Sequence, residues 1–324
     1  MKYAAILSLF LVVFPSWLSN LGRDKLIMFA SLSYYGCDFD GDKLTDLSTW
    51  DSKTNTLYFR LSSNQEFYKR RFFDSEAMFE PVFADYDGDG KTDFAFFHPD
   101  SGQWLIINSS NPDNPRKTFF GNIGDLPIPT DIKGKGVFRP TVWRPNIDLW
   151  LISDVDETGN DVEKVIQEGS YQDSVFSGDY DGDGKSDLTV WRPNEGIWHI
   201  VKSSTGFDFS KSEHIQHGKE WDVIVPNDYN ADGTCDLVFW RPENQTWYFL
   251  YSGSGRNDQI KFGSKGDVPL SADIDGDKIP ELITWSREKK SWTVLNFVKQ
   301  ETLSYKWSVS DNCLPAVSIL QKYE

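Results

Sequence analysis

Residues 179–200 read DYDGDGKSDLTVWRPNEGIWHI and contain the pattern from which the rest of the chain is built. An acidic nine-residue loop comes first, followed by an apolar run, a turn and a second apolar run. Similar loops occur six times, with starts separated by 45 to 49 residues. We number them loop 1 to loop 6: DFDGDKLTD from Asp38, DYDGDGKTD from Asp85, DIKGKGVFR from Asp131, DYDGDGKSD from Asp179, DYNADGTCD from Asp228 and DIDGDKIPE from Asp273. A repeat of this length, with short strands between turns, is typical of a four-stranded β-propeller blade.

The loops place acidic residues at positions 1, 3, 5 and 9, which indicates a calcium site. Calcium takes 6 to 8 oxygen ligands, so several oxygens must converge from one short stretch of backbone. In loop 4 we expect Asp179, Asp181 and Asp183 to point inward, the Lys185 carbonyl to contribute at position 7 and Asp187 to complete the sphere. A single copy is also compatible with an acidic turn that binds no metal. Six copies in phase favour the metal site.

An EF-hand is the alternative calcium motif. It requires a glutamate at loop position 12, where loops 2 and 4 have Phe96 and Val190. These residues lie in apolar runs that favour strands over an exiting helix. The EF-hand interpretation is therefore rejected.

The predicted cofactor is calcium, with up to five ions bound by positions 1, 3, 5, 7 and 9 of five loops. The predicted ligands are Asp38, Asp40, Asp42, Leu44 and Asp46 in loop 1; Asp85, Asp87, Asp89, Lys91 and Asp93 in loop 2; Asp179, Asp181, Asp183, Lys185 and Asp187 in loop 4; Asp228, Asn230, Asp232, Thr234 and Asp236 in loop 5; and Asp273, Asp275, Asp277, Ile279 and Glu281 in loop 6. Residues at position 7 are expected to bind through their backbone carbonyls.

The copies differ in ways that rank them. Loops 2 and 4 keep four aspartates and two glycines, so they are expected to bind most tightly. Loop 5 has the neutral Asn230 at position 3, whereas loops 1 and 6 have Lys43 and Lys278 in place of the second glycine. We expect weaker binding in loop 5 and calcium binding in loops 1 and 6 as well.

Loop 3 replaces three acids by the cationic residues Lys133, Lys135 and Arg139. These side chains would repel a cation, so loop 3 is predicted to hold no metal. We expect them to pair with Asp131 instead and so to hold the turn.

Aromatic residues recur at two fixed offsets after each loop. The first position is Trp50, Phe97, Trp143, Trp191, Trp240 or Trp285, and the second is Leu57, Trp104, Trp150, Trp198, Trp247 or Trp292. Together they account for ten of the 13 tryptophans. Blades are buried on both faces, so packing is the favoured interpretation and sugar stacking is the alternative. Arg144, Arg192 and Arg241 follow the aromatic residue in WRP triplets and are expected to stack on aromatic rings or pair with loop acids.

This combination resembles the FG-GAP or VCBS repeat family of propellers, known from integrin alpha subunits, secreted bacterial proteins and some fungal lectins. The resemblance rests on DYDGDGKTD, DYDGDGKSD, VWRPNEGIW and the elements at Phe262, Gly263, Asp267 and Pro269, and it covers about residues 30 to 310. It implies an all-β propeller with calcium loops between the first two strands of each blade. We predict six four-stranded blades; the alternative is seven, with an incomplete or shared closing blade after Trp307. The family does not imply one activity.

The termini and composition indicate an exported protein. Residues 1–19, with an apolar run from Ala4 to Phe14, resemble a signal peptide with an unclear cleavage site, and an uncleaved interfacial anchor is the alternative. Residues 20–324 are assigned to the propeller. The run is too short to span a bilayer, so no transmembrane span is expected. A secreted, cell-surface or periplasmic location is predicted. A formal charge of −16 argues against nucleic acid as a partner.

Three cysteines leave one thiol unpaired in any disulfide scheme. Cys37 and Cys313 lie near opposite ends of the repeat array, which a closed ring brings together. A disulfide between them is therefore a hypothesis, and sequence alone does not give the geometry that decides it.

The sequence favours a non-catalytic recognition or adhesion module over an enzyme. It contains no HExxH, GxSxG or glycine-rich phosphate motif, and its histidines, His98, His199, His214 and His217, occur in different contexts. The expected partner is an extracellular protein or a glycan. A lectin is the first alternative, with Tyr34, Tyr35, Trp221 and Trp307 as candidate glycan contacts. A propeller hydrolase or lyase is the second alternative, and a scaffold without a specific ligand is a further one.

Overall fold

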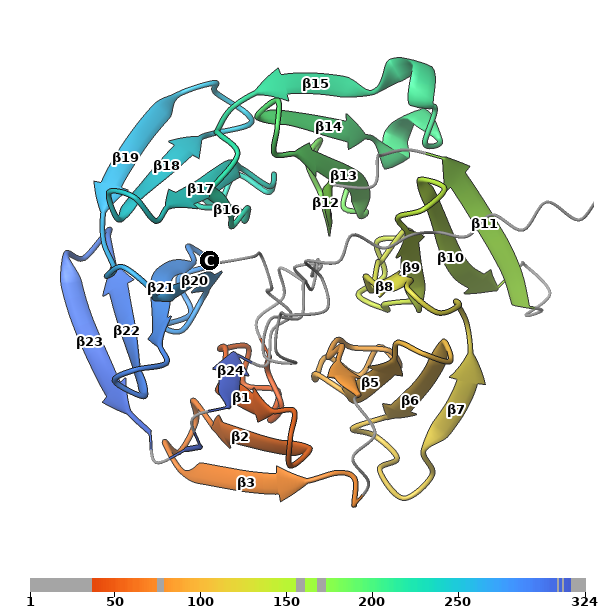
Figure 1. The fold of residues 1–324 in the computed structure, drawn as a ribbon, viewed down its shortest axis with the longest axis horizontal. Coiled ribbons are helices and arrows are strands. Elements are labelled where there is room, and N and C mark those ends of the chain that lie inside the picture. The colour runs from red at the N-terminus through yellow and green to blue at the C-terminus, as the bar shows by residue number, and fades with distance from the viewer. Residues whose placement is uncertain are drawn as a thin grey trace, which may run out of the picture.

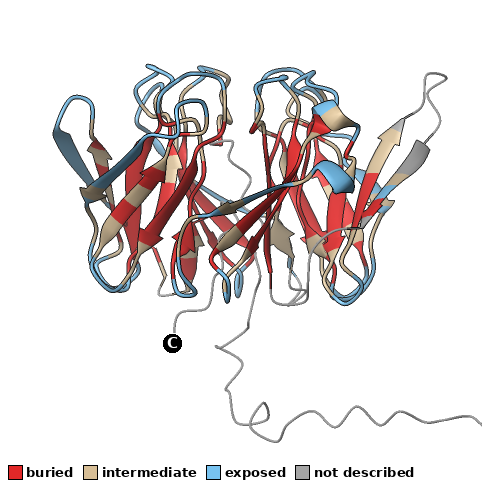
Figure 2. Ribbon diagram, turned by 90° about the horizontal axis from the view of Figure 1, so that it is seen from above, coloured by how far each residue is buried: buried red, intermediate tan, exposed pale blue. Residues whose placement is uncertain are grey.

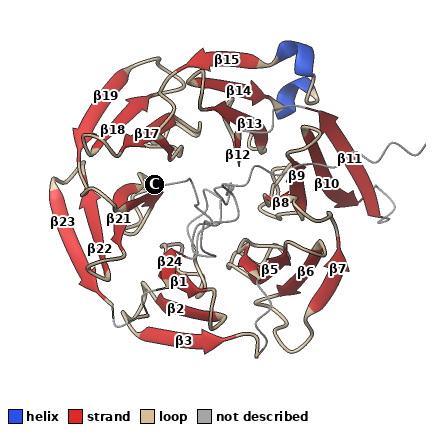
Figure 3. Cartoon of the chain, viewed as in Figure 1, coloured by secondary structure: helices blue, strands red, loops and turns tan. Residues whose placement is uncertain are grey.

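The computed structural model describes residues 37–74, 79–155, 161–167, 173–307, 309–310 and 312–315. The described strands form six four-stranded antiparallel sheets arranged around a central axis (Figure 1). The only helical elements among the described residues are two short 3-10 turns, η2 (Ser203–Thr205) and η3 (Phe209–Lys211) (Figure 3). The prediction of an all-β propeller with six four-stranded blades is confirmed.

The strands of each blade are named in order from the central axis outward. Blade 1 contains β24 (Cys313–Pro315), β1 (Leu47–Asp51), β2 (Thr56–Arg60) and β3 (Phe67–Arg71). Blade 2 contains β4 (Glu80–Pro81), β5 (Phe94–His98), β6 (Gln103–Ile107) and β7 (Arg116–Phe119). Blade 3 contains β8 (Leu126–Pro127), β9 (Thr141–Arg144), β10 (Leu149–Val155) and β11 (Asp161–Gln167). Blade 4 contains β12 (Ser174–Gly178), β13 (Asp187–Arg192), β14 (Ile197–Val201) and β15 (Glu213–Gln216). Blade 5 contains β16 (Val223–Ile224), β17 (Leu237–Arg241), β18 (Thr246–Leu250) and β19 (Asn257–Lys261). Blade 6 contains β20 (Val268–Ala272), β21 (Glu281–Ser286), β22 (Ser291–Asn296) and β23 (Glu301–Lys306).

A strand from the C-terminal part of the chain closes the ring. β24 pairs antiparallel with β1, and Cys313 lies opposite Asp51 in this register. The Ser310 hydroxyl donates to the Asp51 carboxylate at 2.6 Å. The segment after Trp307 therefore supplies the innermost strand of blade 1. Within the described residues this segment does not start a seventh sheet. Of the seven-blade alternative, only the closing strand shared between the two ends of the chain is present there.

The two repeated aromatic positions lie directly opposite each other on neighbouring strands. Trp191 faces Trp198, and the equivalent residues face each other in the other five blades. All twelve side chains are buried, with at most 5% of their surface exposed. The ring centroids of Trp191 and Trp198 are 5.4 Å apart. Because cross-strand aromatic pairs stabilise a sheet and fill the space between blades, the packing interpretation is confirmed.

An aromatic residue followed by glycine precedes three of the blades, at Phe120-Gly121, His217-Gly218 and Phe262-Gly263, and fits against these aromatics. Gly218 has a φ of +123°, and a Cβ at this position would lie 2.6 Å from the Trp191 ring. The residue before it, His217, accepts a hydrogen bond from the Trp198 indole at 2.7 Å. Only glycine provides both the backbone conformation and the space. His217 and Gly218 thus hold the segment that follows the outermost strand β15 against Trp191 and Trp198 of the same blade.

The core is continuous across blade boundaries. One buried cluster joins Trp191 of blade 4, Phe239 of blade 5, Trp285 of blade 6 and Leu47 of blade 1. Most of the inner strands are buried, while the outermost strands β3, β7, β15, β19 and β23 and many of the connecting loops are exposed (Figure 2). Each blade therefore depends on its neighbours to bury its faces.

The three cysteines are free thiols, so the hypothesis of a disulfide between Cys37 and Cys313 is wrong in this structure. Cys37 is buried among the aromatic residues of blades 1 and 2, and burial raises its pKa to about 12. Cys313 lies in the closing strand β24, opposite Asp51 of β1 in the backbone register. Ring closure rests on backbone pairing and packing.

The predicted signal segment, residues 1–19, and the candidate glycan contacts Tyr34 and Tyr35 lie outside the described residues. Within the described part of the chain, no helix has the length and apolar character needed to cross a bilayer.

We expect Trp198→Ala to destabilise the protein by about 3 to 5 kcal/mol, because it removes a buried ring and leaves a cavity. Trp221→Ala is the matched control, since this side chain is 67% exposed, and its effect should stay within about 0.5 kcal/mol. Urea unfolding followed by tryptophan fluorescence measures both. Equal effects would contradict the packing role of the cross-strand pair.

Candidate metal centres

The acidic loops lie on one face of the propeller. Loops 2 to 6 each join the innermost strand of a blade to the second strand, as loop 4 joins β12 to β13. Loop 1 precedes β1, because the innermost strand of its blade comes from the other end of the chain. The connection from the third to the fourth strand of each blade reaches the same face. This places two chain segments of each blade beside its candidate site.

Aspartate at position 1 organises the turn in every loop. In loop 4, Asp179 accepts hydrogen bonds from the backbone N–H groups of Gly182 at 2.6 Å and Gly184 at 2.7 Å. The two glycines have φ values of +79° and +80°. Positions 4 and 6 have positive φ in all six loops, including at Lys43, Ala231 and Lys278. Because non-glycine residues are strained there, loops 1, 5 and 6 form the turn at a cost that loops 2 and 4 avoid.

The position 9 carboxylate is buried at the start of the second strand. Asp187 is fully buried and accepts hydrogen bonds from the backbone N–H groups of Tyr180 at 2.9 Å and Ser203 at 2.7 Å. Loops 1, 2 and 5 repeat both contacts with Asp46, Asp93 and Asp236. The acid therefore ties its own loop to the connection that follows the third strand.

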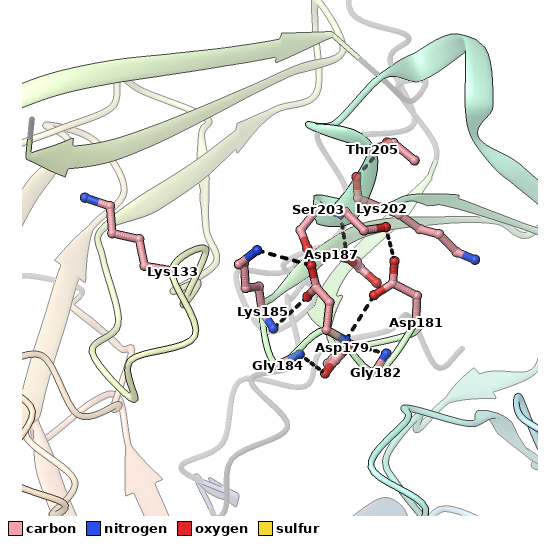
Figure 4. A network of polar contacts seen from close by, with 12 residues as sticks. Lys133, Asp179, Asp181, Gly182, Gly184, Lys185, Asp187, Lys202, Ser203 and Thr205 are labelled. Carbon is pink, nitrogen blue, oxygen red and sulfur yellow. Dashed lines mark hydrogen bonds and ion pairs between the residues drawn. The ribbon is translucent and has the colours of Figure 1, made fainter.

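Carboxylate oxygens converge in four of the six loops. Ligand atoms lie within 4.8 Å of one another in four groups: Asp38, Asp40 and Asp42; Asp85, Asp87 and Asp93; Asp179, Asp181 and Asp187; and Asp273, Asp275 and Glu281. Figure 4 shows the carboxylates of loop 4 gathered on one side of the turn. Hard oxygen donors at this spacing fit calcium or another hard divalent cation, and they do not fit zinc, which prefers nitrogen and sulfur. Loops 1, 2, 4 and 6 are thus compatible with ion binding.

The local electrostatics also favour a cation. Burial, reinforced by neighbouring loop carboxylates, raises the pKa of Asp46 and Asp93 to about 6. The same causes raise the pKa of Asp187, Asp236 and Glu281 to about 7. A divalent ion among these oxygens would stabilise their charged forms and reverse the shift.

Pairs of serines complete the loops, and sequence reasoning missed them. Ser203 donates to Asp183 at 2.7 Å, and Ser204 donates to Asp181. Ser62 and Ser63 make the equivalent contacts in loop 1, as do Ser109 and Ser110 in loop 2. Each pair stands 16 and 17 residues after position 9. The recurring Ser-Ser dipeptide at this fixed offset was the signal available in the sequence. These hydroxyls orient the carboxylates of positions 3 and 5.

Loop 3 forms the same turn without an acidic cluster. Asp131 accepts hydrogen bonds from the backbone N–H groups of Lys133 at 3.2 Å and Gly136 at 2.6 Å. The expectation that the Lys133 ammonium pairs with Asp131 is wrong, because it lies 2.8 Å from Asp154 of β10. Figure 4 shows the Lys133 side chain directed away from the carboxylates of loop 4. In blade 3 the Lys133 ammonium therefore compensates the charge of Asp154.

Loop 5 lacks the convergence seen in loop 4. The Asn230 amide donates to Asp232 at 3.0 Å, and the Thr234 hydroxyl donates to the same carboxylate at 2.5 Å. The second serine is replaced by Gly253, and Ser252 donates to the Cys235 carbonyl at 2.6 Å. The position 5 carboxylate is consequently held by neighbours within its own loop.

Loop 6 contains an internal cation. The Lys299 ammonium contacts Asp275 and lies 3.5 Å from Asp277, at the places that serines occupy in loops 1, 2 and 4. Asn296 donates to Asp275 at 2.7 Å and to Glu281 at 2.9 Å. Burial alone would raise the pKa of Asp275, but the hydrogen bonds from Lys299 and Asn296 lower it below its usual value. The ammonium would have to move for a metal ion to use both carboxylates.

The repeated arginines act at the opposite end of the blades. Arg241 makes two hydrogen bonds of 2.7 Å to Asp222, and Arg144 pairs with Asp125 at 2.8 Å. Arg192 pairs with Asp173 at 3.2 Å. Their partners are the aspartates that precede the innermost strands, not acids of the metal loops. Arg241 also lies over the Tyr248 ring, 4.6 Å from its centroid, which matches the expected stacking.

Two of the candidate glycan contacts are placed by the structure. Trp221 is 67% exposed in the connection between blades 4 and 5. Trp307 is buried and packs against Phe67, with ring centroids 5.2 Å apart, and against Trp292 at 5.8 Å. Trp307 is therefore a packing residue, and the expectation of a glycan contact there is wrong.

Comparisons with known proteins agree with this architecture. A family model described as FG-GAP-like repeat matches residues 38–96 and 228–284, which contain loops 1, 2, 5 and 6. No curated protein sequence matches this chain. Virginiamycin B lyase from Staphylococcus aureus is 11% identical over 86% of this chain and 85% of its own, with a TM-score of 0.52. A chain of the nidogen/laminin complex is 9% identical over 80% of this chain and 93% of its own, with a TM-score of 0.51.

At these identities the two structures show a shared fold alone. The family matches have a more specific basis, because they include acidic loops together with the strands and turns that follow them. The chain is a six-bladed β-propeller in which residues 38–96 and 228–284 match the FG-GAP-like repeat.

Proposed function

We propose that this protein is an exported calcium-binding propeller that acts as a non-catalytic recognition or adhesion module. The observation that carries the proposal is the convergence of carboxylates in four loops on one face of the ring. Extracellular calcium is plentiful, so sites of modest affinity would be filled outside cells. The apolar segment at the N-terminus and the FG-GAP-like repeats support export.

Calcium is preferred over magnesium because of the number of oxygens that each loop offers. Four side-chain ligands and one backbone carbonyl suit the 6 to 8 ligands of calcium, whereas magnesium keeps several waters and requires octahedral geometry. We assign ions to loops 1, 2 and 4 first, weaker binding to loops 5 and 6, and none to loop 3. Bound calcium would neutralise the carboxylates and hold each loop against the connection after the third strand.

The surroundings of the histidines support a role without catalysis. His199 packs against His214 with ring centroids 4.3 Å apart, and burial lowers its pKa to about 4. His217 packs against Phe239 at 4.8 Å, and His98 packs against Phe79 at 5.0 Å. A general base requires a pKa near the working pH and access to a substrate. Aromatic packing of this kind is typical of structural histidines.

A lectin is the second candidate, and one observation favours it. Trp221 presents its ring to solvent on a turn that is fixed by its neighbour Asp222, which pairs with Arg241 at 2.7 Å. An exposed aromatic on a rigid turn provides a flat surface on which a sugar ring can stack. The partner is accordingly an extracellular protein or a glycan.

Calcium should raise the melting temperature of the protein, since a ligand that binds only the native state stabilises it by about 4 kcal/mol per site at a thousandfold excess over Kd. Excess chelator should remove this gain. Asp85→Ala and Asp179→Ala should reduce it, and so should Asp181→Asn, which removes charge while keeping shape. Lys133→Ala is the control and should leave it intact. Identical melting curves with calcium and with chelator would show that the loops are only acidic turns.

Recognition should depend on calcium and should not involve turnover. We expect the secreted protein to retain an extracellular protein or a glycan in calcium and to release it in chelator. A glycan array and pull-down from surface extracts separate the two partner classes. Trp221 lies beside Asp222 on the face opposite the acidic loops, so Trp221→Ala tests the lectin candidate and should abolish its glycan binding, with Trp307→Phe as a packing control. Turnover of a polysaccharide or phospholipid that one point mutation abolishes would overturn the proposal.

A further inference from the structure

The acidic loops are joined to one another around the ring by a repeated backbone hydrogen bond. The N–H group of position 8 in one loop donates to the carbonyl oxygen of position 1 in the preceding loop. Five such bonds are present: Thr45 to Asp273 at 2.9 Å, Thr92 to Asp38 at 2.7 Å, Phe138 to Asp85 at 2.7 Å, Ser186 to Asp131 at 2.9 Å and Cys235 to Asp179 at 2.6 Å. The first of these crosses the closure of the ring, from blade 1 to blade 6.

The sixth place in this series has no donor. Position 8 of loop 6 is Pro280, which lacks a backbone N–H group and therefore cannot bond to Asp228 of loop 5. The loops consequently form an open chain in the order 6, 1, 2, 3, 4 and 5. Two directly joined pairs, loops 6 and 1 and loops 1 and 2, have converging carboxylates in both members. Loop 3 lacks the acids, so it separates loop 2 from loop 4.

Loops 1 and 2 are also joined by a second bond. The backbone N–H group of Asp38 donates to the Thr92 hydroxyl at 2.8 Å, and the Thr92 N–H group donates back to the Asp38 carbonyl at 2.7 Å. Asp38 is a ligand position of loop 1. Thr92 stands between Lys91 and Asp93, the two last ligand positions of loop 2. The reciprocal pair therefore connects a ligand residue of one site to the ligand-bearing segment of the next.

We propose that calcium binds loops 1 and 2 with positive cooperativity through the reciprocal contact between Asp38 and Thr92. This rests on the proposed calcium-binding function. An ion in loop 1 holds Asp38 in place and thereby orders the partner of Thr92. Loop 2 then loses less conformational freedom when its own ion binds, which is the condition for positive coupling. By linkage, an ion in loop 2 favours loop 1 by the same factor.

Electrostatics acts in the opposite sense, because a cation in one loop reduces the negative potential at the other. This effect is screened by salt, with a Debye length of about 8 Å at 0.15 M ionic strength. The hydrogen bonds are not screened in this way. The coupling should therefore increase, or stay constant, as the salt concentration rises.

The test is a double-mutant cycle on the full-length protein, with the total free energy of calcium binding measured by chelator competition at 0.15 M ionic strength. The variants are Asp40→Asn in loop 1, Asp87→Asn in loop 2 and the double variant. Independent sites give additive losses. We expect the double variant to lose less than the sum of the single variants, by a factor of about five or more in binding constant.

Two comparisons identify the route of the coupling. Asp40→Asn combined with Asp181→Asn should be additive, since loops 1 and 4 share no direct bond. Thr92→Pro, which reproduces the situation at Pro280, should make loops 1 and 2 additive; if it does not fold, Thr92→Val removes the hydroxyl alone and should reduce the coupling. Additive losses for loops 1 and 2 in a protein that binds calcium at both would overturn the coupling and leave the proposed function standing. Absence of calcium binding would overturn both.

Discussion

The burial of one carboxylate at the end of five of the six loops is the constraint on which the rest of the structure depends. Asp187 and its counterparts start the second strand of their blades, a few residues before the buried aromatic pair. Backbone N–H groups from two segments hold Asp187 and its counterparts in loops 1, 2 and 5, and burial raises the pKa of each. A buried carboxylate without a full counter-charge is unfavourable, so the fold itself creates the demand for a cation. The acidic cluster that could hold an ion is thus a consequence of how the second strand begins.

The blades meet this demand in different ways. Loops 1, 2 and 4 gather carboxylates and serine hydroxyls, which leaves a cation to be supplied from outside. Loop 6 supplies an ammonium from Lys299, and blade 3 pairs Lys133 with Asp154. At the opposite face, arginines pair with aspartates, as in Arg241 with Asp222. The carboxylates of a loop can therefore be compensated by a cationic side chain of the protein or by a metal ion. The repeat accommodates either alternative with the same backbone turn.

The period of the loops was sufficient to predict the propeller and its six blades, because blade length and cross-strand aromatic offsets are local properties. The sequence did not reveal contacts between distant segments. Ser203 contacts Asp183 only after the intervening hairpin has folded. Lys133 pairs with Asp154 rather than with Asp131, which is nearer in the sequence. The burial of Trp307 and the free state of Cys37 depend on how the two ends of the ring meet. The open chain of backbone hydrogen bonds between loops likewise requires the assembled structure.

The proposed function requires that loops on one face of the propeller bind calcium and thereby stiffen that face for recognition. Its central claim is the location of the ions, which calcium anomalous diffraction from crystals grown with calcium tests most directly. The account predicts anomalous peaks within loops 1, 2 and 4, surrounded by Asp85, Asp87 and Asp93 or their equivalents, and no peak at Asp131. Loops 1, 2 and 4 without peaks, or a peak in loop 3 comparable to theirs, would contradict it.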